Sequence, residues 1–255
     1  MNIRRKICIA VLIVFLCSNF FNTEAVNALA DNEKEKKIAF LTFDDGPCIN
    51  NTQKIIDILK KNNIKATFFI VGQKADENPK AMKELVSSGM CIMPHTYSHE
   101  YKIFKTLNDY ENDLTKCINT IEKYTGKKKF VYVRVPGGSD NLVSNRYVLR
   151  DIRNDIIKQG RYYVDWNVSS GDATAHYVPR DKIINNVKEQ CTDKKIAVIL
   201  MHDAYYKKTT VESLDEIIKY VKDKGYTFKT FDEISDAEKD ELIRIRVINR
   251  KQKID

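Results

Sequence analysis

Residues 38–47 read Ile-Ala-Phe-Leu-Thr-Phe-Asp-Asp-Gly-Pro, an apolar run that ends in two adjacent carboxylates. The run from Ile38 to Phe43 predicts a short buried strand. Asp44 and Asp45 follow it directly, and the glycine and proline after them are typical of a turn. In parallel barrels of strands and helices the reacting groups lie at the carboxyl ends of the strands. We therefore expect Asp44 and Asp45 to belong to a functional site.

The rest of the chain continues the alternation of apolar strands and amphipathic helices, which is typical of parallel α/β architecture. Further strands are predicted at 67–71, 90–93, 130–133, 162–166, 196–201 and 227–231, with helices at 52–62, 79–88, 106–124, 145–159, 180–190 and 211–223. No repeat or internal linker interrupts the series. We expect one α/β domain over residues 31–235, a distorted (β/α) barrel of about seven strands. Residues 236–255 form a charged C-terminal tail, expected to contain a peripheral helix.

Three of the four histidines fall where chemistry is expected. His95 and His99 lie four residues apart in His-Thr-Tyr-Ser-His, and His202 follows the apolar run at 196–201. Two imidazoles and one carboxylate can hold a hydrolytic metal ion and leave positions open for water and substrate. A second carboxylate and a third histidine then remain for proton transfer. The sequence therefore predicts metal-assisted hydrolysis, with no role assigned to His176.

The first 30 residues resemble a secretory signal peptide. Three basic residues at 4–6 precede an apolar run at 7–21, and Ala-Leu-Ala at 28–30 is a small-x-small cleavage pattern. An uncleaved membrane anchor is the alternative, but the apolar run is shorter than the roughly 20 residues that a spanning helix needs. We expect cleavage near Ala30, no stable membrane insertion, and a protein that is secreted or associated with the cell wall.

Composition restricts the classes of partner. The formal net charge of +8 suits an anionic cell envelope, and no arginine-rich block of the kind found in nucleic-acid binders is present. Nucleic acid is therefore not an expected partner, and we expect a monomer. Four of the six cysteines lie outside the predicted leader, too few for a disulfide scaffold and without metal-ligand spacing. Free, partly buried thiols are the simplest interpretation of Cys48, Cys91, Cys117 and Cys191, and from their sequence positions we expect Cys48 and Cys91 to flank the functional site.

Five short motifs follow one another in a fixed order. They are Thr42–Pro47, His95–His99, Arg134-Val135-Pro136-Gly137-Gly138, Trp166–Asp172 and Leu200-Met201-His202. Together they resemble the polysaccharide deacetylase family, the NodB-homology domain of carbohydrate esterase family 4. The resemblance covers about residues 37–234. One such motif alone is only moderately specific, whereas five in order form a strong signature.

The resemblance implies a metal site and a general base. Asp45, His95 and His99 would hold the metal ion, with zinc preferred and cobalt, nickel or manganese left open. Asp44 would remain free of the metal and take the proton from the attacking water. Arg134 would orient Asp44 and keep it as a carboxylate through an ion pair.

The resemblance also implies a proton donor and a substrate-facing wall. His202 would protonate the leaving amine, and Asp172 would stabilise the imidazolium form of His202. The backbone N–H of Gly137 would donate to the developing oxyanion. Trp166 and Leu200 would line the core or the substrate groove.

Three positions depart from the pattern that the family often shows. Pro94 precedes His95 and removes a backbone donor there. Ala173 stands after Asp172 where many members have tryptophan, and Gly137 stands where tyrosine is frequent. We expect the substrate pocket to be wider at Ala173 and at Gly137, because each replaces a large aromatic side chain.

The sequence thus predicts an exported, metal-dependent N-deacetylase of N-acetylhexosamine units in cell-wall glycan, with peptidoglycan as the preferred substrate. Chitooligosaccharide, poly-N-acetylglucosamine and O-acetylated xylan are alternatives within the same chemistry, as is a lactam-forming role in spore cortex. A wall-glycan-binding protein that has lost turnover is the alternative of a different class.

Overall fold

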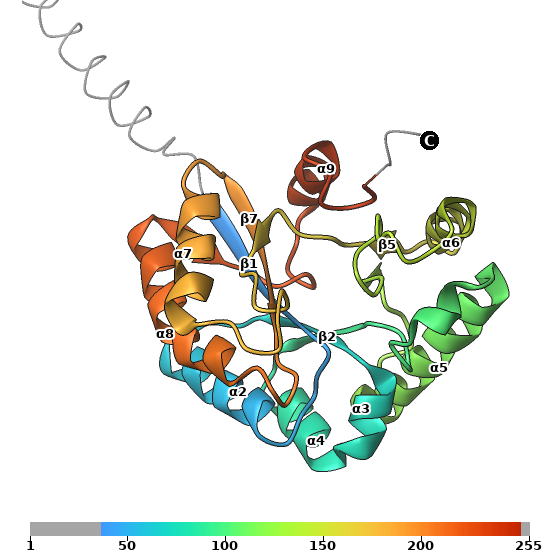
Figure 1. Ribbon diagram of the computed structural model, residues 1–255, viewed down its shortest axis with the longest axis horizontal. Coiled ribbons are helices and arrows are strands. Elements are labelled where there is room, and N and C mark those ends of the chain that lie inside the picture. Colours follow the sequence, from blue (N-terminus) through green and yellow to red (C-terminus); the bar gives the residue numbers. More distant parts are fainter. Residues whose placement is uncertain (1–36, 251–255) are drawn as a thin grey trace, which may run out of the picture. The chain divides into compact units, whose positions relative to one another are not determined.

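The strand predicted at 38–43 is present as β1 (Lys37–Asp44) in the computed structural model, which describes residues 37–250. It lies in the middle of the main sheet, beside β7 (Ile196–His202), and the two strands are parallel (Figure 1). Their pairing runs without a break from Ile38 opposite Ile196 to Asp44 opposite His202. The predicted signal peptide lies outside the described residues, as do residues 251–255.

All the strand pairs are parallel, and they fall into two sheets. The larger has the order β3-β2-β1-β7-β6, with β8 pairing with the first residues of β1, and the smaller is β4-β5. Their bounds are β2 Thr67–Ile70, β3 Cys91–Pro94, β4 Tyr132–Val133, β5 Tyr162–Tyr163, β6 Val168–Ser169 and β8 Tyr226–Phe228. The N–H of Arg134, just after β4, donates to the carbonyl of Pro94 at the end of β3, which links the two sheets. The N–H of Asn167 donates to the carbonyl of Val198 and extends the pairing of β6 with β7. This is the distorted barrel that the sequence predicted.

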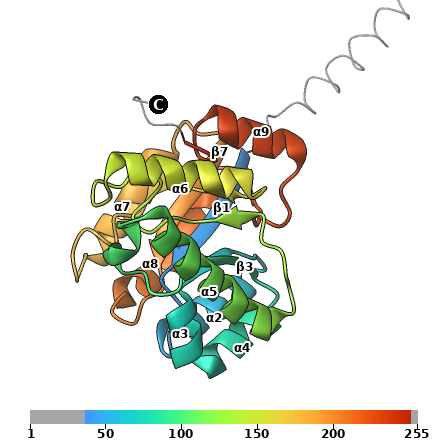
Figure 2. The same cartoon turned by 90° about the vertical axis from the view of Figure 1, so that its right-hand side faces the viewer.

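Helices surround the strands, as Figures 1 and 2 show from two sides. Leu107–Thr125, the long α5, begins after Thr106, whose hydroxyl accepts from the N–H of Asp109, and ends at Gly126, where φ is 68°. Such a cap and a left-handed glycine are the usual boundaries of a helix. The other helices are α2 Asn51–Lys61, α3 Gly72–Glu77, α4 Pro79–Ser87, η1 Tyr101–Phe104 (a 3-10 helix), α6 Arg146–Lys158, α7 Arg180–Cys191, α8 Lys208–Asp223 and α9 Asp236–Arg244.

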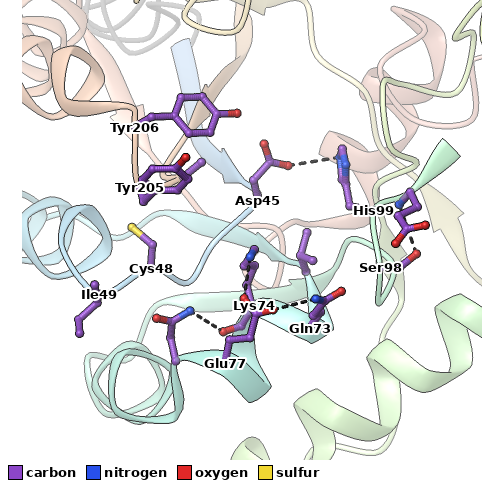
Figure 3. A pocket seen from close by; sticks show the side chains of 14 residues that line it. Asp45, Cys48, Ile49, Gln73, Lys74, Glu77, Ser98, His99, Tyr205 and Tyr206 are labelled. Atoms are coloured by element: carbon purple, nitrogen blue, oxygen red, sulfur yellow. Dashed lines mark hydrogen bonds and ion pairs between the residues drawn. The ribbon is translucent and has the colours of Figure 1, made fainter. Parts of the chain in front are cut away.

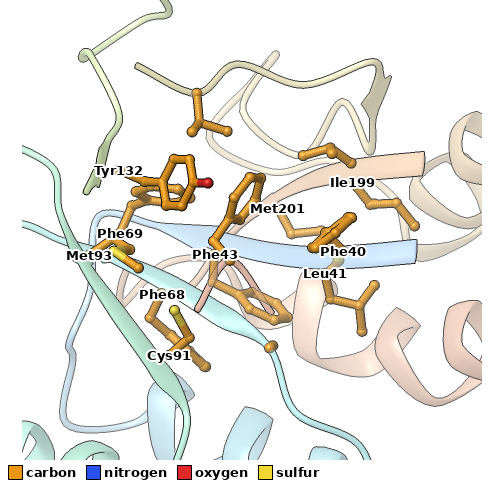
Figure 4. Packing of buried hydrophobic residues seen from close by; sticks show 14 of the residues in the cluster. Phe40, Leu41, Phe43, Phe68, Phe69, Cys91, Met93, Tyr132, Ile199 and Met201 are labelled. Atoms are coloured by element: carbon orange, nitrogen blue, oxygen red, sulfur yellow. The ribbon is translucent and has the colours of Figure 1, made fainter. Parts of the chain in front are cut away.

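An aromatic cluster fills the interior of the barrel (Figure 4). The ring of Phe231 lies 4.9 Å from that of Phe40 and 5.3 Å from that of Tyr132, measured between centroids. Because side chains alternate along a strand, Thr42 and Asp44 lie on the same face of β1 as Phe40. The interior face of β1 therefore changes from apolar to acidic at its carboxyl end.

The C-terminal residues that the structure describes pack onto this core. The predicted peripheral helix is present as α9, and the segment after it returns to the barrel. Val247 and Ile248 are fully buried, and Ile248 forms an antiparallel bridge with Val164 just after β5. This segment therefore belongs to the wall of the barrel that carries β5.

The four cysteines in the described part of the chain are buried free thiols, in agreement with their simplest interpretation. Sequence order suggested that Cys48 and Cys91 both flank the site. That expectation is wrong for Cys91, because it begins β3 and so lies at the end of the sheet away from the functional residues. Within residues 37–250, none of the helices combines the length and the apolar character needed to cross a membrane.

Candidate active site

The carboxyl ends of β1, β3 and β7 bring the predicted site residues together. Asp44 ends β1 directly opposite His202, which ends β7. His95 follows the last residue of β3, and β3 is joined to β1 through β2. Parallel strands put their carboxyl ends at the same edge of the sheet, so residues far apart in sequence meet there.

Asp45, His95 and His99 form a compact cluster of potential metal ligands. The Oδ1 atom of Asp45 lies 3.3 Å from Nε2 of His99 and 3.7 Å from Nε2 of His95. Each residue offers one ligand atom, and all three atoms lie within 4.8 Å of one another. This is the set that the sequence predicted for a metal.

The atoms of this cluster fit a cation. Nδ1 of His95 lies 2.8 Å from the carbonyl oxygen of Arg134, which can only accept, so Nδ1 carries the proton and the Nε2 lone pair faces Asp45. Burial, the largest influence, lowers the pKa of His95 to about 4, which keeps the ring neutral. Oδ1 of Asp45 is buried and has no hydrogen-bond partner among the described residues. A carboxylate oxygen and an imidazole lone pair that face each other in this way provide an electron-rich site for a metal ion.

The charge of Asp45 is maintained by its neighbours. Burial acts to raise the pKa of this carboxyl, but electrostatic attraction, chiefly from the His202 imidazolium, outweighs it, and the pKa lies below its usual value. An ionised Asp45 is the form that a metal ion requires.

The His95–His99 segment is a tight turn and not a helix. Thr96 and His99 have φ angles of 67° and 56°, in the left-handed region that residues with a Cβ rarely adopt. A carboxylate oxygen of Asp113, on α5, accepts from both backbone N–H groups of residues 97–98 and holds the turn in place. The two imidazoles meet because of this turn, with ring centroids 5.0 Å apart.

Arg134 is fully buried and holds Asp44. Its Nη1 donates to Oδ1 of Asp44 and to the hydroxyl of Thr42, each at 2.8 Å. Nε and Nη2 donate to the backbone carbonyls of residues 164 and 165, and the guanidinium lies over the ring of Phe69. The predicted ion pair is therefore present, and it leaves the second oxygen of Asp44 on the side of His95, at 3.7 Å from Nε2.

His202 and Asp172 form a hydrogen-bonded pair on the opposite side of the site. Nδ1 of His202 lies 2.7 Å from Oδ1 of Asp172, while Oδ2 accepts from the His202 backbone N–H and from the hydroxyl of Thr210. Burial opposes the charge of His202, but Asp172 outweighs it and raises the pKa of His202 to about 9. At neutral pH His202 is therefore an imidazolium that can donate a proton.

The loop that carries Gly137 lies close to the ligand cluster. The N–H of Gly138 closes a turn on the carbonyl of Val135, whereas the N–H of Gly137 donates no hydrogen bond within residues 37–250. A Cβ on Gly137 would lie 3.9 Å from the ring of Tyr101, whose centroid is 6.4 Å from that of His99. The backbone donor expected at Gly137 is thus free, and its φ of 73° suits glycine.

Trp166 and Leu200 differ in their surroundings. Trp166 packs beside the same loop, since a Cβ on Gly138 would lie 3.2 Å from its ring. Leu200 is buried on β7 opposite Thr42. A substrate contact of Leu200 stays a prediction.

A groove with a volume of about 540 Å³ opens beside Asp45 and His99 (Figure 3). Polar side chains of α3, among them Gln73 and Lys74, line one wall. Tyr205, 67% exposed, stands on the other. The sequence prediction did not include this groove, although the two tyrosines at 205–206, shortly after His202, were a usable signal.

Two buried charged residues near His202 were also missed. Asp203 accepts from the hydroxyl of Thr52 at 2.5 Å, and a Cβ on Gly46 would lie 2.1 Å from its carboxylate, so only glycine fits the turn after Asp45. Burial raises the pKa of Asp203 to about 7. Lys207 donates to the carbonyl of Asp172 at 2.6 Å and holds the loop that carries that residue. Asp203 and Lys207 act as structural supports of the site because they are buried, and the sequence pattern does not reveal that burial.

The fold and the site define a hydrolase with an α/β barrel and a candidate metal centre. Comparison with known proteins agrees: residues 31–156 match the polysaccharide deacetylase family. The chain is 32% identical to a peptidoglycan-N-acetylglucosamine deacetylase of Bacillus cereus, over 80% of this chain and 72% of that protein. It is 29% identical to a peptidoglycan-N-acetylmuramic acid deacetylase of Bacillus subtilis, over 80% of this chain and 73% of that protein.

A solved structure is similar over most of the chain. The catalytic domain of a peptidoglycan N-acetylglucosamine deacetylase from Eubacterium rectale matches with a TM-score of 0.71 and 34% identity, covering 76% of this chain and 88% of that one. The chain belongs to the polysaccharide deacetylase family, as its five motifs indicated, and is a hydrolase that acts on amide bonds.

Proposed function

We propose that this protein is an exported, metal-dependent N-deacetylase that removes acetyl groups from N-acetylhexosamine units of peptidoglycan. The observation that carries the proposal is the buried Oδ1 of Asp45, which has no hydrogen-bond partner among the described residues and faces two imidazoles. Two ion pairs, Arg134–Asp44 and His202–Asp172, lie on either side of it. Such an arrangement supports hydrolysis with a bound cation better than a purely structural role, because a buried anionic oxygen without a partner is costly.

The residues divide the reaction between them. Zn²⁺, held by Asp45, His95 and His99, would supply polarisation of the acetamide carbonyl and acidification of water. Asp44 takes a proton from the attacking water with the oxygen that Arg134 does not hold.

The later steps use the other side of the site. As the water oxygen bonds to the carbonyl carbon, negative charge grows on the carbonyl oxygen, and the Gly137 N–H donates to it. His202 gives its proton to the nitrogen as the carbon–nitrogen bond breaks, and Asp172 stabilises the imidazolium until then. The products are acetate and an amine on the sugar.

The groove supports a polymeric substrate. Its volume and its exposed tyrosine provide room and an aromatic face for a sugar next to the one that reacts. Peptidoglycan is preferred among acetylated polymers because two relatives are peptidoglycan deacetylases and because residues 1–30 have the pattern of an export signal.

Acetate release from purified peptidoglycan, chitotetraose and acetylxylan, measured with Zn²⁺ added, tests the proposal. We expect release from peptidoglycan to be fastest and the Asp44→Asn variant to abolish it. Fastest release from chitotetraose or acetylxylan would change the assigned substrate but would leave the assigned reaction, hydrolysis of an acetyl group, in place. Release from none of them, with metal bound at one ion per chain, would contradict the enzymatic proposal and favour a protein that only binds glycan.

A further inference from the structure

The loop that carries Gly137 is held from beneath by one buried carboxylate. Asp165 is 1% exposed, and its two oxygens accept from the backbone N–H of Ser139 at 2.8 Å and from the Ser139 hydroxyl at 2.5 Å. Arg153 of α6 donates to the carbonyl of Ser139 at 3.0 Å. The position of this loop therefore depends on where Asp165 lies.

A single arginine of the C-terminal segment forms an ion pair with Asp165 and hydrogen bonds with its surroundings. Nε of Arg250 donates to the backbone carbonyl of residue 246 at 3.1 Å and lies 3.4 Å from Oδ2 of Asp165. Nη1 donates to the carboxylate of Asp140 at 3.1 Å, and Nη2 donates to the carbonyl of Trp166 at 2.8 Å. The backbone of Arg250 is fixed as well, because its carbonyl accepts from the hydroxyl of Tyr163 at 3.0 Å. The guanidinium thus joins the loop at Asp140 to the segment at 165–166, which connects β5 to β6.

The same connecting segment also supports the proposed general base. The backbone carbonyl of Asp165 accepts from Nη2 of Arg134 at 3.1 Å, and Nη1 of Arg134 donates to Asp44. The segment at 165–166 therefore contacts two parts of the proposed machinery. One contact leads through Ser139 to the oxyanion loop, and the other leads through Arg134 to the base.

We propose that Arg250 is a positioning residue for the deacetylation reaction, acting through Asp165 on the Gly137 loop and on Arg134. This inference rests on the proposed function. Arg250 touches none of the groups expected to react, so its effect comes from the geometry that it maintains. Removing it leaves the buried carboxylate of Asp165 with Ser139 as its one remaining partner in the described part of the chain, and a buried charge that has lost its ion-pair partner is destabilised. Its environment then rearranges, and the loop loses its fixed position.

The test compares Arg250→Ala with Arg244→Ala. Arg244 lies on α9 and, among residues 37–250, pairs only with Glu241 three residues earlier, so its removal is a matched control for the loss of a C-terminal arginine. We expect kcat of Arg250→Ala to fall about tenfold to a hundredfold, less than the complete loss of an oxyanion donor, with KM within about twofold. Arg244→Ala should leave both constants unchanged.

A second readout does not depend on activity. Trp166 is the only tryptophan of the chain, and its carbonyl is bonded to Arg250. We expect acrylamide to quench the fluorescence of Trp166 more strongly in Arg250→Ala than in the wild type. Quenching in Arg244→Ala should equal that of the wild type. If the wild type releases no acetate, the proposed function fails, and the quenching comparison still tests the contact of Arg250 with this segment.

Arg250→Lys covers the case in which the alanine variant does not fold. Lysine keeps the charge but cannot make the three contacts at once. We expect an intermediate kcat and intermediate quenching. A folded Arg250→Lys or Arg250→Ala protein with the kcat and quenching of the wild type would overturn the proposal, and so would a rise in KM at constant kcat.

Discussion

The two sides of the candidate site differ in how their polar groups are satisfied. On one side, His202 and Asp172 complete each other, and Thr210 and a backbone N–H occupy the remaining carboxylate positions. On the other side, Asp45, His95 and His99 converge, and the buried Oδ1 of Asp45 has no donor among the described residues. The first side has all its hydrogen bonds in place, as the proposed proton donor requires, whereas the second has the open arrangement of donor atoms expected of a cation site. The comparison teaches that, under the proposed function, only the proton-donor half of the site is complete in the protein alone.

The largest expected effect follows from removing a ligand on the incomplete side. His99→Ala should lower bound zinc from one ion per chain to near zero and acetate release by about a thousandfold or more, because the ion contributes several kcal/mol. Elemental analysis and an acetate assay measure the two quantities. His176→Ala is the matched control, since His176 stacks on Tyr206 and is no part of the cluster. Stoichiometric zinc in His99→Ala would contradict the assigned ligand set.

Asp44→Asn should separate chemistry from metal binding. We expect kcat to fall about 10²-fold to 10⁴-fold, the usual contribution of a general base, while zinc content stays at one ion per chain. Asp57→Asn, an exposed change on α2, serves as the control. Near-normal kcat in the Asp44 variant would remove this residue from the role of base. Circular dichroism should accompany the assay, since Asp44 is paired with a buried arginine.

Asp172→Asn tests the finished side of the site. The Asp172 carboxylate raises the pKa of His202 to about 9. The protonated form is the donor and is lost as pH rises through that pKa, so wild-type activity should fall at alkaline pH. Without the carboxylate charge the pKa of His202 drops, and the alkaline limb of the kcat–pH profile should move to lower pH. An unmoved limb would show that His202 does not control it. Zinc content should be unchanged, because Asp172 is not a ligand.

The smallest effect is expected in the groove beside the metal cluster. Tyr205→Ala should raise KM for chitotetraose up to about tenfold, since an aromatic contact contributes about 0.5–1.5 kcal/mol, and should leave zinc binding and kcat unchanged. Tyr177→Ala is the control, because Tyr177 is 68% exposed and does not line the groove. Equal KM values for the two variants would argue against a sugar at Tyr205.

Sequence reasoning succeeded where the information is local. Apolar runs such as 38–43 and 196–201 mark strands because each contains its own pattern, and the longer helices have periodic apolar faces. The short helix α3 was missed, since in six residues only Ala75 is a buried apolar side chain. The error over Cys91 has another origin. Cys91 is close to His95 in sequence but not in space, because the length of β3 separates the two positions.

The sequence by itself determined the order of the motifs, the types of the reacting side chains and the family to which the chain belongs. Tertiary structure alone decided that Asp44 lies opposite His202 and that His95 is neutral with its lone pair toward Asp45. It also decided that Arg250 reaches Asp165. The physical reason is that motifs and periodicity are properties of neighbouring residues, whereas strand register, burial and the resulting pKa values depend on which distant segments pack together.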